Sequence, residues 1–201
     1  MSEGKLNFDY DGRLRKLPND FWLFEYPDLL GAFGVGPKQD EAIHNAHAAA
    51  ERWLRDATNA GTAPPKKGAY NAYSGALRLR LPKSLRHEVD DLAQGLGISR
   101  ASLIRTLVEF GLSKMFAPDE QTLNAIVDAE RSSFNQCPAD RRHQWPKVQQ
   151  RSKSPERADW LIRFDPATHY HLMVLSEAEE VSANMLLVSL ISKQMTSVHD
   201  Y

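Results

Sequence analysis

The 201-residue chain has one cysteine, almost no net charge and no long apolar run. A lone Cys137 cannot form an internal disulfide, which favours a reducing compartment. No stretch reaches the ~18 apolar residues of a membrane span, and residues 1–5 lack the apolar core of a secretion signal. We therefore expect a cytoplasmic protein without a membrane partner. A net charge of −1 also excludes a binder that is basic all over its surface.

The positive charge is concentrated in two places. Residues 66–105 hold eight Lys or Arg against three acids, and residues 139–163 hold seven against three. A neutral chain with such basic islands can still hold phosphate locally. The second island contains an arm at 141–157 that either contacts nucleic acid or is only solvated, and the sequence leaves this choice open.

The first third of the chain predicts a small α+β unit. Residues 13–17, 21–26 and 32–36 are short, apolar or aromatic, and bounded by turn residues, which is typical of strands. Apolar residues at helical spacing then predict a helix over 40–58. The order is ββ(β)α. Residues 61–75 contain Gly, Pro-Pro and Lys-Lys, which predicts a linker.

A strand followed by two helices is predicted next. Residues 77–81 alternate Leu and Arg and end at Pro82, as a half-buried strand would. A first amphipathic helix ends near Gly97, and Ser99 is the expected N-cap of a second one. A further helix is expected over 118–133.

Residues 158–195 repeat this pattern. Setting Ser182 against Ser99 gives an offset of 83 (182 − 99). The outward positions of the second copy, Asp159, Leu161 and Arg163, are less suited to DNA than those of the first. Its strand could pair with the first strand of the same chain or with another chain, and we expect a role in assembly.

A forty-residue strand-helix-helix cannot bury its own apolar faces, so two copies are needed. Their strands would pair into a ribbon that fits the DNA major groove, with Leu77, Leu79 and Leu81 inward. The DNA-binding residues predicted on the ribbon and at the start of the second helix are Ala76, Arg78, Arg80, Ser99, Arg100 and Ser102, with Lys83 and Arg163 as possible additions. This segment resembles the ribbon-helix-helix repressors over residues 76–115.

A second resemblance covers residues 10–65. The segment 20–33, with the turn Pro27-Asp28-Leu29-Leu30-Gly31, resembles the strand–turn–strand signature of HicB-type antitoxins, with Leu30 in place of a proline. The resemblance implies a partial RNase H-like fold that binds a HicA-like, mRNA-cleaving toxin. Trp22, Phe24 and Tyr26 alternate on one strand face and are candidate toxin anchors. The alternative is that they form the core of the domain.

The sequence thus predicts an α+β chain with a partial RNase H-like domain followed by mainly helical ribbon-helix-helix units. The predicted divisions are 1–62 toxin-binding domain, 63–75 linker, 76–116 DNA-binding unit, 117–134 helical connector, 135–157 basic linker and 158–195 second unit. We expect an antitoxin that represses its own operon, binds operator DNA and a toxin, and forms a homo-oligomer. The alternative is a stand-alone regulator whose first domain binds a ligand or mediates oligomers. Enzymatic activity, a metal and a cofactor are not expected, because no converging carboxylates or ligand spacing suggest them.

Overall fold

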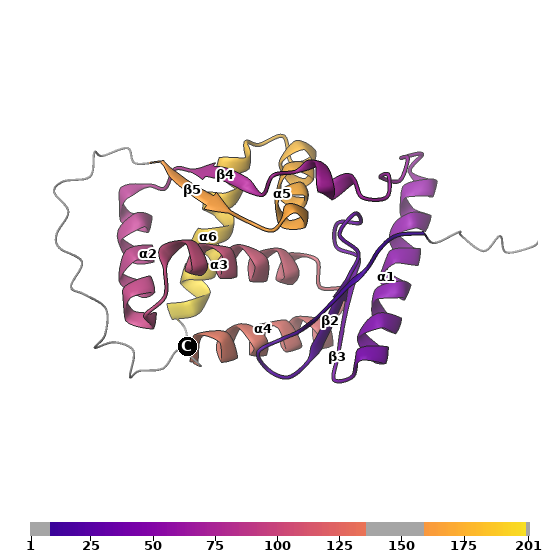
Figure 1. Cartoon of the computed structure of the whole chain (residues 1–201), viewed down its shortest axis with the longest axis horizontal. Helices are drawn as coiled ribbons and strands as arrows, with labels where there is room; N and C mark the ends of the chain where they lie inside the picture. Colours follow the sequence, from indigo (N-terminus) through magenta and orange to yellow (C-terminus); the bar gives the residue numbers. More distant parts are fainter. Residues whose placement is uncertain (1–8, 136–158, 200–201) are drawn as a thin grey trace, which may run out of the picture.

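The computed structural model describes residues 9–135 and 159–199 (Figure 1). The elements, in chain order, are β1 (Arg13–Lys16), β2 (Trp22–Glu25), β3 (Phe33–Gly36), α1 (Gln39–Asn59), the 3-10 helix η1 (Ala69–Ala72), β4 (Ala76–Leu79), α2 (Lys83–Leu96), α3 (Arg100–Met115), α4 (Glu120–Asn135), β5 (Trp160–Arg163), α5 (Pro166–Ala178) and α6 (Ala183–His199). The fold class is α+β, as predicted. A three-stranded antiparallel sheet with a helix precedes a mostly helical region that carries a two-stranded sheet.

The first sheet has the order β1-β2-β3, with both pairs antiparallel. Helix α1 lies very close to β3, since a Cβ added at Gly34 would lie 2.3 Å from the backbone nitrogen of Ala46. Small residues on both elements permit this approach: Ala42 and Ala46 are fully buried. The predicted ββ(β)α order is therefore confirmed.

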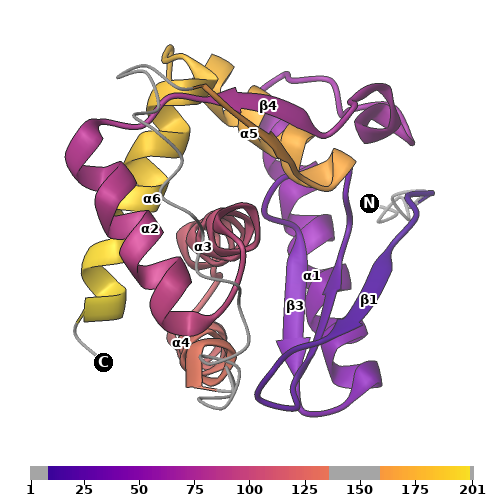
Figure 2. The ribbon, with the colours of Figure 1, turned by 60° about the vertical axis from the view of Figure 1, so that its left-hand side comes forward.

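Both faces of this sheet are covered (Figure 2). On one face, Tyr26 packs with Ala46, Ala50 and Leu54 of α1. On the other, Leu23 and its neighbours on the sheet pack with apolar residues of α4, among them Ile126, and with the end of α3. The first unit therefore shares its core with the helical region. Among the described residues, no helix is long and apolar enough to cross a membrane.

Strands β4 and β5 pair with each other, antiparallel, within the same chain. The sequence left open whether the second strand pairs within or between chains, and the structure shows pairing within the chain. Both views place this strand pair at the edge of the molecule, above α3 and α6 (Figures 1 and 2). The main core lies beneath it, where Leu107 of α3 and Leu190 of α6, equivalent under the offset of 83, are both buried.

The segment predicted as a linker, 63–75, has structure of its own. It contains η1, which packs against α5. The buried Asp28 carboxylate accepts hydrogen bonds from the backbone N–H groups of Gly68 (2.8 Å) and Tyr70 (3.3 Å). The sequence indicates only a turn at Asp28, because a contact across forty residues leaves no local pattern. The predicted basic linker, with Cys137, lies almost wholly outside the described residues.

Candidate nucleic-acid interface

The β4–β5 pair has one buried and one exposed face. Leu79 and Ile162 point into the core and are almost completely buried. Since side chains alternate along a strand, the opposite face carries the other residues of each strand. These outward residues are Ala76, Arg78, Arg80, Asp159, Leu161 and Arg163. A two-stranded ribbon with such a face has the width of the DNA major groove.

Arg80 is held by an ion pair at one end of the ribbon. Its Nε and Nη2 donate to the two carboxylate oxygens of Asp159, at 2.7 and 3.0 Å. These hydrogen bonds lower the pKa of Asp159 below its ordinary value, and Arg78 contributes to the same shift from further away. The side-chain amide of Asn184 bonds the backbone N–H and C=O of Arg80. The sequence predicts that Arg80 reads bases, but its guanidinium already has an anionic partner in the structure.

Arg78 and Arg163 are exposed, and neither forms an ion pair with another residue in the described ranges. Arg163 lies opposite Ala76, and Arg78 lies opposite Leu161, whose side chain is 58% exposed. Arginine can donate two parallel hydrogen bonds to guanine, and leucine can contact the methyl group of thymine. These two arginines are therefore the cations of the ribbon that are available for bases.

The start of α3 combines a serine cap with an arginine that already has partners. The Ser99 hydroxyl accepts a hydrogen bond from the Ser102 N–H at 3.1 Å, as an N-cap does, so this prediction is confirmed. Arg100, predicted as a phosphate contact, forms an ion pair with Asp90 and lies 5.5 Å from the ring centroid of Trp160. Lys83 is exposed at the start of α2.

Arg105 is a further cation of this site that was not predicted from the sequence. It lines a groove with Ser102, Thr106 and Arg163, next to the start of α3, and Glu109 and Asp165 complete the walls with Phe164 and Pro166. Arg105 is exposed, and it forms no ion pair within residues 9–135 and 159–199. The signal was available, because Arg105 follows Ser102 by three residues and so lies on the same helix face.

The three candidate toxin anchors lie mainly inside the first unit. Tyr26 is 2% exposed, and its hydroxyl lies 2.9 Å from Nδ1 of His47. Burial raises the pKa of Tyr26 to about 12. Phe24 packs edge-to-face on Tyr26 at 5.2 Å between ring centroids, and Trp22 is half-buried. Their shared face is the one that α1 covers.

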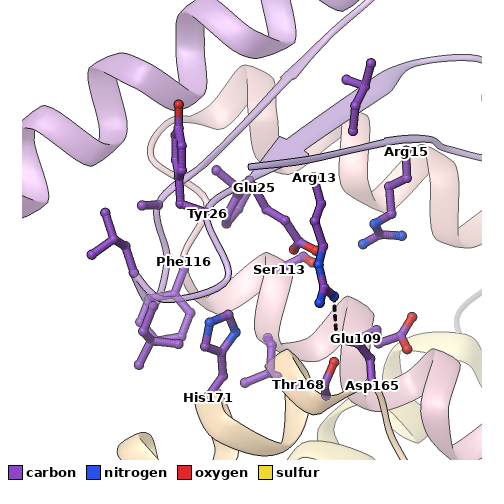
Figure 3. Close-up of a pocket in the computed structure, with 17 residues that line it drawn as sticks. Arg13, Arg15, Glu25, Tyr26, Glu109, Ser113, Phe116, Asp165, Thr168 and His171 are labelled. Atoms are coloured by element: carbon purple, nitrogen blue, oxygen red, sulfur yellow. Dashed lines mark hydrogen bonds and ion pairs between the residues drawn. The ribbon is translucent and has the colours of Figure 1, made fainter. Parts of the chain in front are cut away.

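A cavity of about 340 Å³ lies between the first sheet and the helical region (Figure 3). Its polar walls include Glu25 of β2, Glu109 of α3 and His171 of α5, and Arg13 reaches across to Asp165 at 2.7 Å. Burial raises the pKa of Glu109 above its ordinary value, against the opposing effect of Arg15. Burial also lowers the pKa of His171, whose Nε2 donates to the carbonyl oxygen of Pro27 at 2.8 Å.

Comparison with protein families, curated proteins and solved structures finds no match for this chain. The interface therefore has to be judged on its geometry. Within the described ranges, no group of three or more His, Cys, Asp or Glu side chains is placed to hold a metal ion. The groups brought together are instead a ribbon with exposed arginines, a capped helix start beside it, and a mixed-charge cavity that shares Glu109 and Asp165 with the groove at that helix start.

Proposed function

We propose that this chain is a sequence-specific DNA-binding protein of the ribbon-helix-helix type, in which one chain supplies both halves of the unit. We further propose that it is an antitoxin of the HicB type that represses its own operon. The first half of the proposal concerns β4 to α6. The second half concerns the sheet and α1, which we assign to a partial RNase H-like domain.

The observation that carries the DNA-binding proposal is the antiparallel β4–β5 pair with Arg78 and Arg163 on its exposed face. Helices α3 and α6 start near the two ends of this ribbon, and each start has a serine N-cap, Ser99 and Ser182. Free N–H groups at a helix start suit phosphate, and they can fix the register of a ribbon in the groove.

The antitoxin proposal rests on the resemblance of residues 10–65 to HicB-type antitoxins. The aromatic face of β2 is covered by α1, so a toxin would meet another surface. The exposed side of α1 carries more acids than bases: Asp40, Glu41, Glu51 and Asp56 against Arg52 and Arg55. An RNA-cleaving toxin must itself attract phosphate, so a net acidic surface is complementary to it.

The test of DNA binding is a gel-shift titration against the DNA upstream of the protein's own gene. We expect sequence-preferring binding by the wild type, and a loss of at least tenfold in the double variant Arg78→Ala with Arg163→Ala. The matched control is Arg52→Ala with Arg55→Ala, which removes two exposed arginines that lie on α1 and not on the ribbon. An equal loss of DNA affinity in both double variants would show that binding depends only on general charge attraction. It would reject the assignment of Arg78 and Arg163 as base-reading residues.

The toxin half has a separate test. The product of a neighbouring gene that encodes a small basic protein should cleave mRNA when it is alone, and this activity should stop on addition of the chain. The variant Glu51→Lys with Asp56→Lys should lose this inhibition and keep its DNA binding. Cleavage that continues at a molar excess of the wild-type chain would reject the antitoxin assignment.

One observation favours a second candidate, a stand-alone regulator that responds to a small ligand. The cavity between the sheet and helices α3 and α5 has the size of a small-molecule site, for which about 300–1,000 Å³ is usual. A ligand there would touch both halves of the molecule. A thermal-shift screen of small metabolites would test it, and the variant Ser113→Leu, which narrows the cavity, should abolish any shift found.

A further inference from the structure

The two ends of the β4–β5 ribbon are equivalent under the internal repeat, yet their chemistry differs. We infer that the ribbon reads a non-palindromic DNA site, in one orientation, with one chain per site. The phosphate-holding and guanine-reading end is the one that carries Arg163 and Arg105. This inference rests on the DNA binding proposed above and specifies the kind of site.

The contrast appears in two equivalent grooves. The groove at the start of α3 contains Arg105 and Ser102, and the offset of 83 places Val188 and Met185 at the same positions in the groove at the start of α6 (105 + 83 = 188, 102 + 83 = 185). Met185 is 62% exposed. A cation and a hydroxyl at one end thus correspond to two apolar side chains at the other.

The arginines on the strands differ in the same sense. Arg163 forms no ion pair with any residue that the structure describes, whereas its equivalent Arg80 is bound to both oxygens of Asp159. A guanidinium that must first leave a carboxylate binds DNA more weakly than one that is free, because the ion pair has to be broken. The Arg163 end therefore attracts DNA more strongly than the Arg80 end.

Two carboxylates border the basic groove, and one of them, Asp165, is held by an ion pair and a backbone hydrogen bond. Asp165 accepts from Arg13 at 2.7 Å and from the backbone N–H of Ala167 at 2.9 Å. Glu109 is half-buried and also faces the cavity on the other side, away from the ribbon. The exposed charged groups at this groove are thus the two arginines and Asp165, whose carboxylate already has Arg13 as its partner, and the half-buried Ser102 lies beside them.

The centre of the ribbon is also asymmetric. Arg78 and Leu161 are repeat equivalents (78 + 83 = 161) and lie directly opposite one another. In a ribbon of two identical chains this point would hold two identical residues. Here an arginine faces a leucine, so a guanine is favoured on one side of the centre and a thymine methyl on the other.

The experiment is selection of DNA sites from a random pool by the full chain, followed by anisotropy titrations of the enriched site. We expect a motif without two-fold symmetry and a stoichiometry of one chain per duplex. A palindromic motif with equal arms would overturn this inference and leave DNA binding intact. A pool that yields no bound DNA would instead overturn the proposed function, and this inference with it.

Matched variants at equivalent positions test the polarity. Arg105→Val should weaken binding and reduce the slope of log affinity against log salt by about one, as expected for the loss of one phosphate contact. Val188→Ala, at the equivalent position of α6, should leave both unchanged. Melting temperatures of both variants show whether they are folded. Equal effects of the two changes would mean that both ends hold phosphate alike and would overturn the polarity.

Discussion

Arg78 of β4 lies directly opposite Leu161 of β5, and the two are the same position in the two halves of the repeat. Under the offset of 83, Leu77 is equivalent to Trp160 and Leu79 to Ile162, and the pairs in the ribbon are Leu77 with Ile162 and Leu79 with Trp160. Each of the two leucines thus pairs with the equivalent of the other, as it would across a twofold axis. A pseudo-twofold axis therefore passes through the central pair of Arg78 and Leu161. The chain thus supplies both members of a ribbon that a homodimer would otherwise form.

A cross-link at this pair tests the closure within one chain. Arg78→Cys with Leu161→Cys, in a Cys137→Ser background, should oxidise to a disulfide within the monomer, because opposite Cα atoms in an antiparallel pair are about 4.5–5.5 Å apart. Non-reducing electrophoresis and intact mass check it. Arg78→Cys alone is the control. A disulfide-linked dimer of that single variant would show that β4 pairs with its own copy in another chain.

Local patterns predicted the elements of this fold well. Short apolar or aromatic runs bounded by turn residues placed β1, β2 and β3, and alternation placed β4. Helical spacing placed α1, α2 and α3, and the repeat located β5 and α6. The partner of β5 could not be predicted, because pairing within or between chains buries the same alternate residues. The same limit applies to β2. Alternation puts Trp22 and Tyr26 on one face, but both faces of this sheet are covered, so the pattern does not identify a free one.

Side-chain partners of the candidate site were harder to predict. The sequence places Arg80 and Arg100 where DNA contacts are expected. Their ion-pair partners depend on tertiary structure: the strand register brings Asp159 to Arg80, and the packing of α2 against α3 brings Asp90 to Arg100. The repeat could have suggested the pair of Arg80 with Asp159. Asp159 is equivalent to Ala76 (76 + 83 = 159), and in an antiparallel ribbon the first residue of one strand lies opposite the last residue of the other. The hydrogen bonds to the Asp28 carboxylate connect segments forty residues apart, so no local sequence pattern predicts them.

Asp159→Asn should increase DNA affinity severalfold. The change keeps the shape of the side chain, removes a negative charge from the proposed DNA face and frees Arg80 from its ion pair. If the released guanidinium reaches a phosphate, the slope of log affinity against log salt steepens by about 0.9. Anisotropy titrations at several salt concentrations measure both quantities. An unchanged affinity would show that this end of the ribbon does not approach DNA.

The ion pair between α3 and α4 is buried, and its loss should be costly. The Lys114 Nζ lies 2.8 Å from a carboxylate oxygen of Glu130, which is 0% exposed. Lys114→Met leaves a buried carboxylate without its cation and should lower the free energy of unfolding by about 3–5 kcal/mol. Adding Glu130→Met should restore most of this loss, since two apolar side chains can replace a buried pair. Urea denaturation measures both, and a single variant as stable as the wild type would contradict the structure here.

The Glu109 carboxyl at the cavity predicts a pH-dependent stability. Its pKa is raised above the ordinary value of 4.5, chiefly by burial, so the folded state keeps this proton to a higher pH than the unfolded state. The contribution of Glu109 to the free energy of unfolding is therefore largest at low pH, and it falls as the pH rises from about 4.5 through the folded-state pKa.

Glu109→Gln is neutral at every pH and cannot follow this fall. The variant should be more stable than the wild type at pH 7, and this advantage should shrink towards pH 4. Urea denaturation between pH 4 and 8 measures the difference, with the exposed Glu88→Gln of α2 as the control. A constant difference across this range would mean that Glu109 titrates alike in the folded and unfolded states. The interface between the sheet and the helical region would then be more hydrated than the packing of α3 against the sheet indicates.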